Sequence, residues 1–170
     1  MYKKIIILGG SGSGKSTLTN NIAKHTGYPI YHLDELFLES DFTMKDKTMW
    51  PEISKVFLEQ NVGVVDGNYG SNLPLRVKWA DLIIYIDIST WLQIYRILKR
   101  YFNVRLGKEN RIGISMKSRE KINLNFLIWV LNWNRTRRNK TLRILEEQAS
   151  DKKVIIIHRL SDLDLEDLFN

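Results

Sequence analysis

Cysteine is absent from this chain of 170 residues, and histidine is scarce, with three residues in all. Without cysteine, the protein has no disulfides, no thiolate ligands for zinc and no cysteine nucleophile. The histidines lie far apart in the sequence, and none has the spacing of a metal-ligand pair. Long apolar runs are also lacking, because none approaches the roughly 18 residues that span a bilayer. We therefore expect no membrane-spanning segment and no membrane partner.

The first residues lack the features of a targeting segment. The sequence MYKKIIILGG has two lysines and then an apolar stretch of only about five residues, with no cleavage site. A signal peptide needs a longer apolar stretch, so this segment is more typical of a buried first strand. We therefore expect a cytoplasmic protein.

The composition is that of a globular domain with an unevenly placed basic region. Apolar residues make up 44% of the chain and charged residues 26%. The sequence contains no repeat, no low-complexity segment and no linker, so we expect residues 1–170 to form a single domain. The net charge is +7, yet residues 96–143 alone hold 14 Lys/Arg and two acids. The basic character therefore needs a local explanation.

Short β-branched runs alternate with helical patterns five times along the chain. We expect strands at 3–8, 29–34, 62–67, 80–87 and 153–158. We expect helices at 15–25, 51–60, 89–101, 119–148 and 161–169, and a loop at 103–118. This alternation predicts a three-layer α/β fold in which helices cover both faces of one parallel sheet.

The segment from Gly9 to Ser16 satisfies G-x-x-x-x-G-K-[ST], with a β-branched strand before it and a helix after it. Glycines let backbone N–H groups converge on phosphate, and the helix adds the positive end of its dipole. We expect Lys15 to reach the β- and γ-phosphates and the Ser16 hydroxyl to bind Mg²⁺. Thr17 either contacts the α-phosphate or is simply a hydroxyl in the first helical turn. The predicted nucleotide-binding residues are Gly9, Ser11, Gly12, Ser13, Gly14, Lys15, Ser16 and Thr17.

Two acidic residues are placed at the expected carboxyl edge of the sheet, where ligands bind in open α/β folds. Asp66 ends the apolar run of VVDGN and is a candidate for holding Mg²⁺ through water, or else a turn residue before Gly67. Asp34 in HLDE is a candidate for binding the acceptor or acting as general base, or else a helix N-cap. His32 is more typical of a packed or hydrogen-bonded strand residue.

Arginines in the basic region are candidates for stabilising a transferring phosphoryl group. Arg96 and Arg100 lie four residues apart on one helix face, which either reaches the nucleotide or is a solvated basic face. A basic lid at about 103–118 would close over the site and exclude water. Arg100 and Arg135 are the candidate catalytic arginines, and the other candidates are Arg105, Arg111, Arg119, Arg137 and Arg138.

Several stretches together resemble the bacterial topology modulation (FlaR-type) proteins, a branch of the adenylate-kinase-like P-loop kinases. They are GGSGSGKST, YHLDELF, VVDGNYGSNLPLR, ADLIIYID and IYRILKR. The resemblance implies a five-stranded parallel sheet in the order 2-3-1-4-5, a lid, and ATP and Mg²⁺ as ligands. It also implies that Arg96 and Arg100 contact adenine and phosphates.

The sequence departs from adenylate kinase directly after Asp66-Gly67. That enzyme's Asp-Gly-Phe-Pro-Arg becomes Asp66-Gly67-Asn68-Tyr69-Gly70, so the arginine that would hold the acceptor's phosphate is missing there, with Arg76 as a possible substitute. A phosphate acceptor needs arginines, whereas a hydroxyl acceptor benefits from a carboxylate base. This favours a hydroxyl acceptor, such as a nucleoside or another small metabolite.

These observations predict an ATP-dependent phosphotransferase that acts on a nucleoside- or nucleotide-like or other small acceptor. The alternative is an ATP-binding regulatory protein associated with DNA. Its support is the basic region with interleaved aromatic residues, although Trp129 and Trp133 also fit an apolar helix face that packs on the core. A third possibility, a nucleotide-hydrolysing switch, lacks an NKxD-type sequence for reading the base.

Overall fold

In the computed structural model, the described residues are 1–38, 43, 45–106 and 124–169. Five parallel strands form one sheet in the order β2-β3-β1-β4-β5. The strands are β1 (Lys4–Gly9), β2 (Ile30–His32), β3 (Gly63–Asp66), β4 (Leu82–Ile86) and β5 (Lys153–Ile157). The predicted α/β class and strand order are therefore confirmed.

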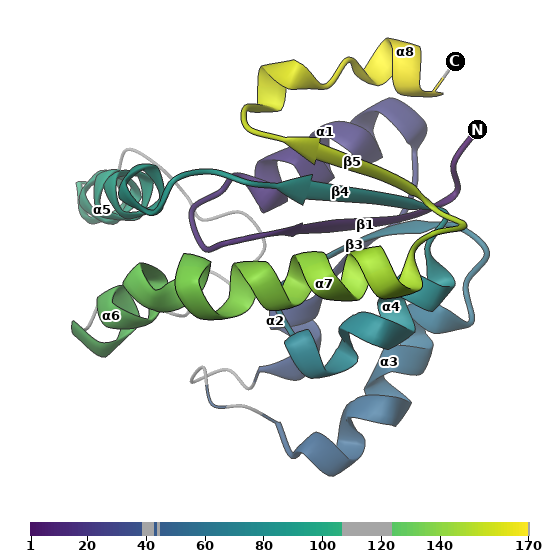
Figure 1. Ribbon diagram of the computed structural model, residues 1–170, viewed down its shortest axis with the longest axis horizontal. Helices are drawn as coiled ribbons and strands as arrows, with labels where there is room; N and C mark the ends of the chain where they lie inside the picture. Colours follow the sequence, from purple (N-terminus) through teal and green to yellow (C-terminus); the bar gives the residue numbers. More distant parts are fainter. Residues whose placement is uncertain (39–42, 44, 107–123, 170) are drawn as a thin grey trace.

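Helices cover both faces of this sheet and make the three layers that were predicted (Figure 1). One face is covered by α1 (Lys15–Thr26) and α8 (Leu165–Phe169), and the other by α3 (Trp50–Leu58), α4 (Leu73–Trp79) and α7 (Asn139–Gln148). The remaining helices are α2 (Leu33–Phe37), α5 (Thr90–Arg105) and α6 (Leu124–Trp133). None of the described helices is long and apolar enough to cross a membrane.

The central strand explains why the layers form. Ile5 and Ile7 pack under α1, while Ile6 and Leu8 pack under the opposite helices. Each of the three isoleucines is fully buried and contributes about 2 kcal/mol of hydrophobic stabilisation. A strand buried on both faces has an uninterrupted apolar sequence, as KIIILG has.

The strand register brings the polar strand ends together at one edge. Ile7 pairs with Asp66, and Asp66 pairs with His32 on the other side. The carboxyl ends of β1, β2 and β3 therefore meet beside the segment that leads into α1.

The second strand is shorter than predicted. It ends at His32, and α2 begins at Leu33 with Asp34 in its first turn. Asp34 is therefore a helix residue and not the end of a strand. Helix α4 was not predicted, although Pro74 stands at its start, where the missing N–H costs nothing.

The predicted long helix at 119–148 is interrupted. Over the described residues it consists of α6, a π-helical turn η3 (Asn134–Arg138) and α7. Helix α5 continues to Arg105, so the start of the predicted loop is helical, and residues 107–118 of the predicted lid lie outside the described residues.

The helices predicted at 89–101 and 161–169 each begin with a serine, but only one of these serines is a cap. Ser89 caps α5, because its hydroxyl accepts a hydrogen bond from the N–H of Leu92. Ser161 does not cap the terminal helix, because it lies in a short 3₁₀ turn, η4 (Leu160–Asp162). The carboxylate of Asp164 accepts from the N–H groups of Glu166 and Asp167 instead, and α8 begins there.

Candidate functional site

The glycine-rich segment between β1 and α1 adopts the backbone that a phosphate-binding loop requires. Gly9, Gly12 and Gly14 have φ values of 146°, 74° and 102°. A Cβ at Gly9 would lie 2.7 Å from the carbonyl oxygen of Ile86, so glycine is required there for space as well. Gly14 is the N-cap of α1 and has no side chain, which leaves the first-turn N–H groups to a ligand anion.

The Lys15 side chain folds over this loop. Its Nζ donates hydrogen bonds to the carbonyl oxygens of Gly9 and Gly10, both at 2.9 Å. Burial lowers the pKa of the ammonium to about 8, and the nearby carboxylates of Asp66 and Asp34 offset part of that effect. The structure therefore brings the P-loop lysine and both predicted acids to one site.

Asp66 is a buried carboxylate with two side-chain partners and not an exposed turn residue. It is only 4% exposed and is the last residue of β3. Its Oδ1 lies 2.7 Å from Nδ1 of His32, and its Oδ2 accepts a hydrogen bond from the Thr19 hydroxyl at 3.3 Å. Burial alone lowers the pKa of His32, but the hydrogen bond and charge of Asp66, together with the charges of Glu35 and Asp34, raise it above the ordinary value. The interpretation of His32 as a hydrogen-bonded strand residue is confirmed.

Asp34 lies across from a tyrosine of the neighbouring loop. Its Oδ1 accepts a hydrogen bond from the Tyr69 hydroxyl at 3.0 Å. Burial, with the charge of Asp34, raises the pKa of Tyr69, so the tyrosine stays protonated as a donor. The N-cap of α2 is His32, and no side chain makes a capping hydrogen bond there. The alternative role of Asp34 as an N-cap is therefore wrong.

Helix α5 places both of its paired arginines at the P-loop. Nη1 of Arg96 donates to the carbonyl oxygen of Ser13 at 3.0 Å, and the charge of Arg100 contributes to lowering the pKa of Lys15. The alternative of a solvated basic face is therefore wrong for Arg96, and the role of Arg100 stays a prediction. Gln93 was missed: its side chain lies against Gly10, and its Nε2 donates to Ile88. The sequence feature that could have indicated Gln93 is its position four residues before Ile97, which places a polar side chain on the buried face of α5.

Other predicted residues are less well placed by the structure. Ser16 and Thr17 lie in the first turn of α1, with Thr17 exposed. Arg135 belongs to the π-helical turn, but its side chain lies outside the described residues, as do Arg111 and Arg119 entirely.

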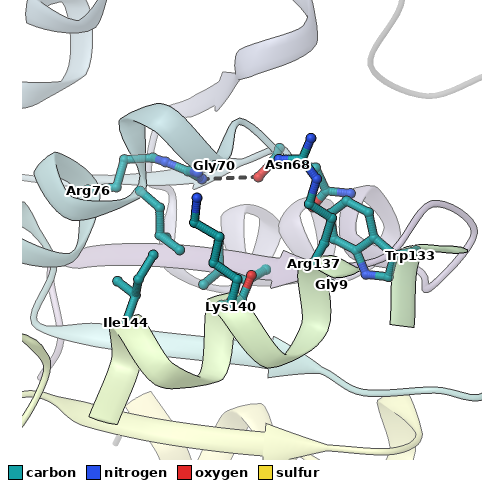
Figure 2. A pocket seen from close by; sticks show the side chains of 12 residues that line it. Gly9, Asn68, Gly70, Arg76, Trp133, Arg137, Lys140 and Ile144 are labelled. Atoms are coloured by element: carbon teal, nitrogen blue, oxygen red, sulfur yellow. Dashed lines mark hydrogen bonds between the residues drawn. The ribbon is translucent and has the colours of Figure 1, made fainter. Parts of the chain in front are cut away.

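A pocket lies beside the P-loop, between the turn after β3 and helices α4 and α7 (Figure 2). It encloses about 420 Å³, including its open mouth. Its lining residues are Leu8, Gly9, Gly67, Asn68, Gly70, Leu73, Arg76, Trp133, Arg137, Lys140, Thr141 and Ile144. The pocket thus adjoins the P-loop on the side of β3.

Arg76 supports the turn that forms one wall of this pocket. Its side chain is 1% exposed, and its guanidinium donates to the carbonyl oxygen of Gly67 at 3.0 Å (Figure 2). It also donates to the carbonyl oxygen of Tyr69 at 2.8 Å. Burial lowers the pKa of Arg76 to about 10, while Asp66 opposes this. Two of its nitrogens are thus committed to the protein backbone, which leaves Arg76 poorly suited to replace the arginine missing after Asn68.

The donor groups fit a magnesium ion only together with phosphates. Among the described residues, no group of three or more His, Asp or Glu side chains is arranged to hold a metal ion. Mg²⁺ usually keeps several waters and takes one or two carboxylates plus substrate phosphates. The Ser16 hydroxyl and the carboxylates of Asp66 and Asp34 are compatible with that mode of binding.

Solved structures that are similar to this chain include three kinases. A gluconokinase from Sinorhizobium meliloti matches with a TM-score of 0.51 at 18% identity, covering 97% of this chain and 86% of its own. A deoxyadenosine kinase from M. mycoides with bound dATP has a TM-score of 0.47 at 17% identity, with coverages of 96% and 93%. A shikimate kinase from Aquifex aeolicus has a TM-score of 0.45 at 16% identity, with coverages of 96% and 89%. The similarity to the gluconokinase shows a shared fold.

No protein-family model matches this sequence, and the search of curated proteins finds no match. The resemblance to the topology modulation proteins therefore stays a prediction.

Proposed function

We propose that this protein is an ATP-dependent phosphotransferase that moves the γ-phosphoryl group of ATP to a small acceptor. The observation that carries the proposal is the meeting of Lys15, Asp66 and Asp34 at one edge of the sheet, beside a separate pocket. An ammonium on a glycine-rich loop binds phosphates, and a neighbouring pocket holds the group that accepts one. The shared fold with a gluconokinase and the sequence resemblance to adenylate-kinase-like proteins are compatible with it.

On the donor side, the first-turn N–H groups of α1 and the Lys15 ammonium would bind the phosphates. Arg96 braces the loop through Ser13, and Arg100 would add positive charge where the transferred group becomes more anionic. Leu160 would offer an apolar surface to the adenine base of ATP, because its side chain lies 3.4 Å from where a Cβ of Gly14 would be.

On the acceptor side, Asp34 would accept a proton from the attacking hydroxyl. Its hydrogen bond from Tyr69 fixes the orientation of the carboxylate. The neighbouring Lys15 and Arg100 would hold the phosphoryl oxygens while the proton moves to Asp34. Mg²⁺, held by Ser16 and through water by Asp66, would neutralise phosphate charge when bound.

The first prediction concerns Lys15→Ala, which removes the only charge that lies on the P-loop itself. ADP release with Mg-ATP and an active acceptor should fall by at least about a hundredfold, because stabilisation of the transferring phosphoryl group is lost. The acceptor is found beforehand by screening nucleosides, nucleotides, sugars and hydroxy acids for increased ADP release.

Lys24→Ala is the matched control, because Lys24 is exposed at the other end of the same helix. Its activity should equal that of the unmodified protein. Normal turnover in Lys15→Ala, or ADP release that no acceptor in the screen increases, would contradict the proposed function.

A further inference from the structure

The pocket beside the P-loop carries more positive charge than a neutral acceptor would need. Arg137 and Lys140 line it from one wall, and the buried Arg76 lies in the opposite wall. Among the described residues, neither Arg137 nor Lys140 forms an ion pair. Nε of Arg76 is also buried without a hydrogen-bond partner there. An anion in the pocket would meet the side chains of Arg137 and Lys140, with the buried charge of Arg76 behind the opposite wall.

The Arg137 guanidinium lies directly against the turn that follows β3. A Cβ at Gly70 would be 3.5 Å from Nη1 of Arg137, which is van der Waals contact. In Figure 2, Arg137 and Lys140 rise from one helix face toward Asn68 and Gly70. Arg137 therefore brings a cation to the stretch in which adenylate kinase has its own arginine, but from a different element.

An ion pair of the next residue anchors the π-helical turn that carries Arg137. Arg138 donates two hydrogen bonds to one oxygen of Asp87, from Nε at 3.2 Å and Nη2 at 2.7 Å, and a third from Nε to the other oxygen at 2.9 Å. Asp87 follows the end of β4, so the pair fixes the rotation of the turn relative to the sheet. Such π turns within helices occur frequently at functional sites.

The pocket also lies on the side of the P-loop away from Leu160, where the nucleotide's base is proposed to bind. Gly67, Asn68 and Gly70 follow β3, whereas Arg96 and Leu160 follow β4 and β5. Because β3 and β4 flank β1 on opposite sides, an anion at Arg137 is separated from the site proposed for the nucleotide's base. Such an anion is therefore part of the acceptor and not of the nucleotide.

We infer that the acceptor carries an anionic group, a carboxylate or a phosphate, in addition to its hydroxyl, and that Arg137 and Lys140 bind this group. The inference rests on the proposed kinase function for the identity of the ligand as acceptor. It narrows the expectation of a hydroxyl acceptor to one that is also anionic, because the positive charge missing after Asn68 is supplied by α7 and the turn before it.

The inference is tested first by direct binding. The protein is saturated with the β,γ-imido analogue of ATP and Mg²⁺, which occupies the P-loop, and inorganic phosphate is then titrated by calorimetry. Phosphate should bind, and Arg137→Gln should weaken binding about tenfold or more, since a charge-assisted contact contributes about 1.5–3 kcal/mol. Lys140→Gln should weaken it less, because an ammonium makes no bidentate contact.

Arg143→Gln is the matched control, because Arg143 lies on α7, as Lys140 does, with its side chain 79% exposed and paired to Glu147. It removes the same charge and should leave phosphate binding unchanged. Absence of phosphate binding, or equal affinities in Arg137→Gln and Arg143→Gln, would overturn the inference.

Turnover with matched pairs of compounds distinguishes the sources of the anion. The pairs are gluconate and sorbitol, glycerate and glycerol, and glycerol 3-phosphate and glycerol, with the phosphorylated product identified as an ester of the hydroxyl. The anionic member of the active pair should have a kcat/KM at least about tenfold higher, and Arg137→Gln should remove that preference. A neutral compound that performs as well as its anionic partner would contradict the inference.

Failure of the kinase proposal would look different. If the ATP analogue does not bind, the proposed function is wrong, and phosphate is then titrated into the protein without nucleotide. An Arg137-dependent site in that experiment supports an anion pocket independent of kinase activity. If no such site is found, both the kinase function and the anion site at Arg137 are wrong.

Discussion

Lys15 is a residue whose charge state is sensitive to its surroundings. Burial brings the pKa of its ammonium to about 8, so at pH 8 about half of the free molecules carry it uncharged. A bound polyanion favours the charged form and raises this pKa. Nucleotide binding near pH 8 is therefore coupled to proton uptake, and affinity decreases as the pH rises above 8.

We expect calorimetry of nucleotide binding at pH 8, in two buffers with different ionisation enthalpies, to show an uptake of about half a proton. Lys15→Arg keeps its charge across this range and should show no such uptake. Equal proton uptake in the two proteins would exclude Lys15 as the titrating group.

Substitution of Asp34 distinguishes a general base from a carboxylate with a purely structural role. Asp34→Asn keeps the shape and the ability to accept a hydrogen bond from Tyr69, but it cannot take a proton from a hydroxyl. The kcat should fall by about 10²- to 10⁴-fold, with a melting temperature close to that of the unmodified protein.

Tyr69→Phe is the companion variant, because it removes the hydrogen bond and keeps the carboxylate. A smaller loss of kcat is expected there, since the base remains and only its orientation is relaxed. If the Asp34→Asn variant retains normal turnover, Asp34 is not the base.

At the scale of elements, an ion pair anchors the π-helical turn that carries Arg137 to the end of β4. The pair of Arg138 and Asp87 is partly buried, with side-chain exposures of 36% and 12%. Charge-assisted bonds with several contacts are stronger than exposed surface pairs. The backbone position of Arg137 is thus supported by a pair to which it does not belong.

We expect Arg138→Gln and Asp87→Asn each to lower the free energy of unfolding by about 1–3 kcal/mol, measured by urea denaturation. The double variant should lose less than the sum of the single variants, because one interaction is removed in all three. Arg143→Gln on the exposed face of α7 should change it by less than about 0.5 kcal/mol. Additive losses would mean that the pair does not act as a unit.

At the scale of the whole molecule, the basic region is divided between two tasks. Arg96 and Arg100 face the P-loop, and Arg137 and Lys140 face the pocket, which accounts for part of the positive charge without nucleic acid. The aromatic support for DNA binding is divided. Trp133 is only 5% exposed and lines the pocket, as expected of a residue that packs on the core, but Trp129 is 39% exposed and Phe102 58%.

DNA association therefore stays a prediction with an explicit test. We expect binding of a fluorescent duplex at 150 mM salt to be no tighter than about 1 µM, the range of non-specific binding. Nanomolar affinity that falls steeply with salt and is undiminished by ATP would support the regulatory alternative.

Much of the fold and of the donor site was predictable because the signals are local. The P-loop is read from consecutive residues, and each buried strand is a short apolar run, so the sequence by itself determined the α/β class and the position of Lys15. Thr19 and Gln93 could not be assigned in this way. The partner of Thr19 lies 47 residues away along the chain, and Gln93 contacts Gly10 from a different element.

The acceptor side was decided by tertiary structure alone. Asp34 was placed at a strand end, but packing ended β2 at His32 and put Asp34 in a helix facing Tyr69. Arg137 was one of many arginines in a basic stretch, and only the ion pair of Arg138 with Asp87 after β4 and the approach of α7 to the turn after β3 bring it to the pocket. A P-loop is formed by neighbours in the chain, whereas a pocket between elements depends on how those elements pack.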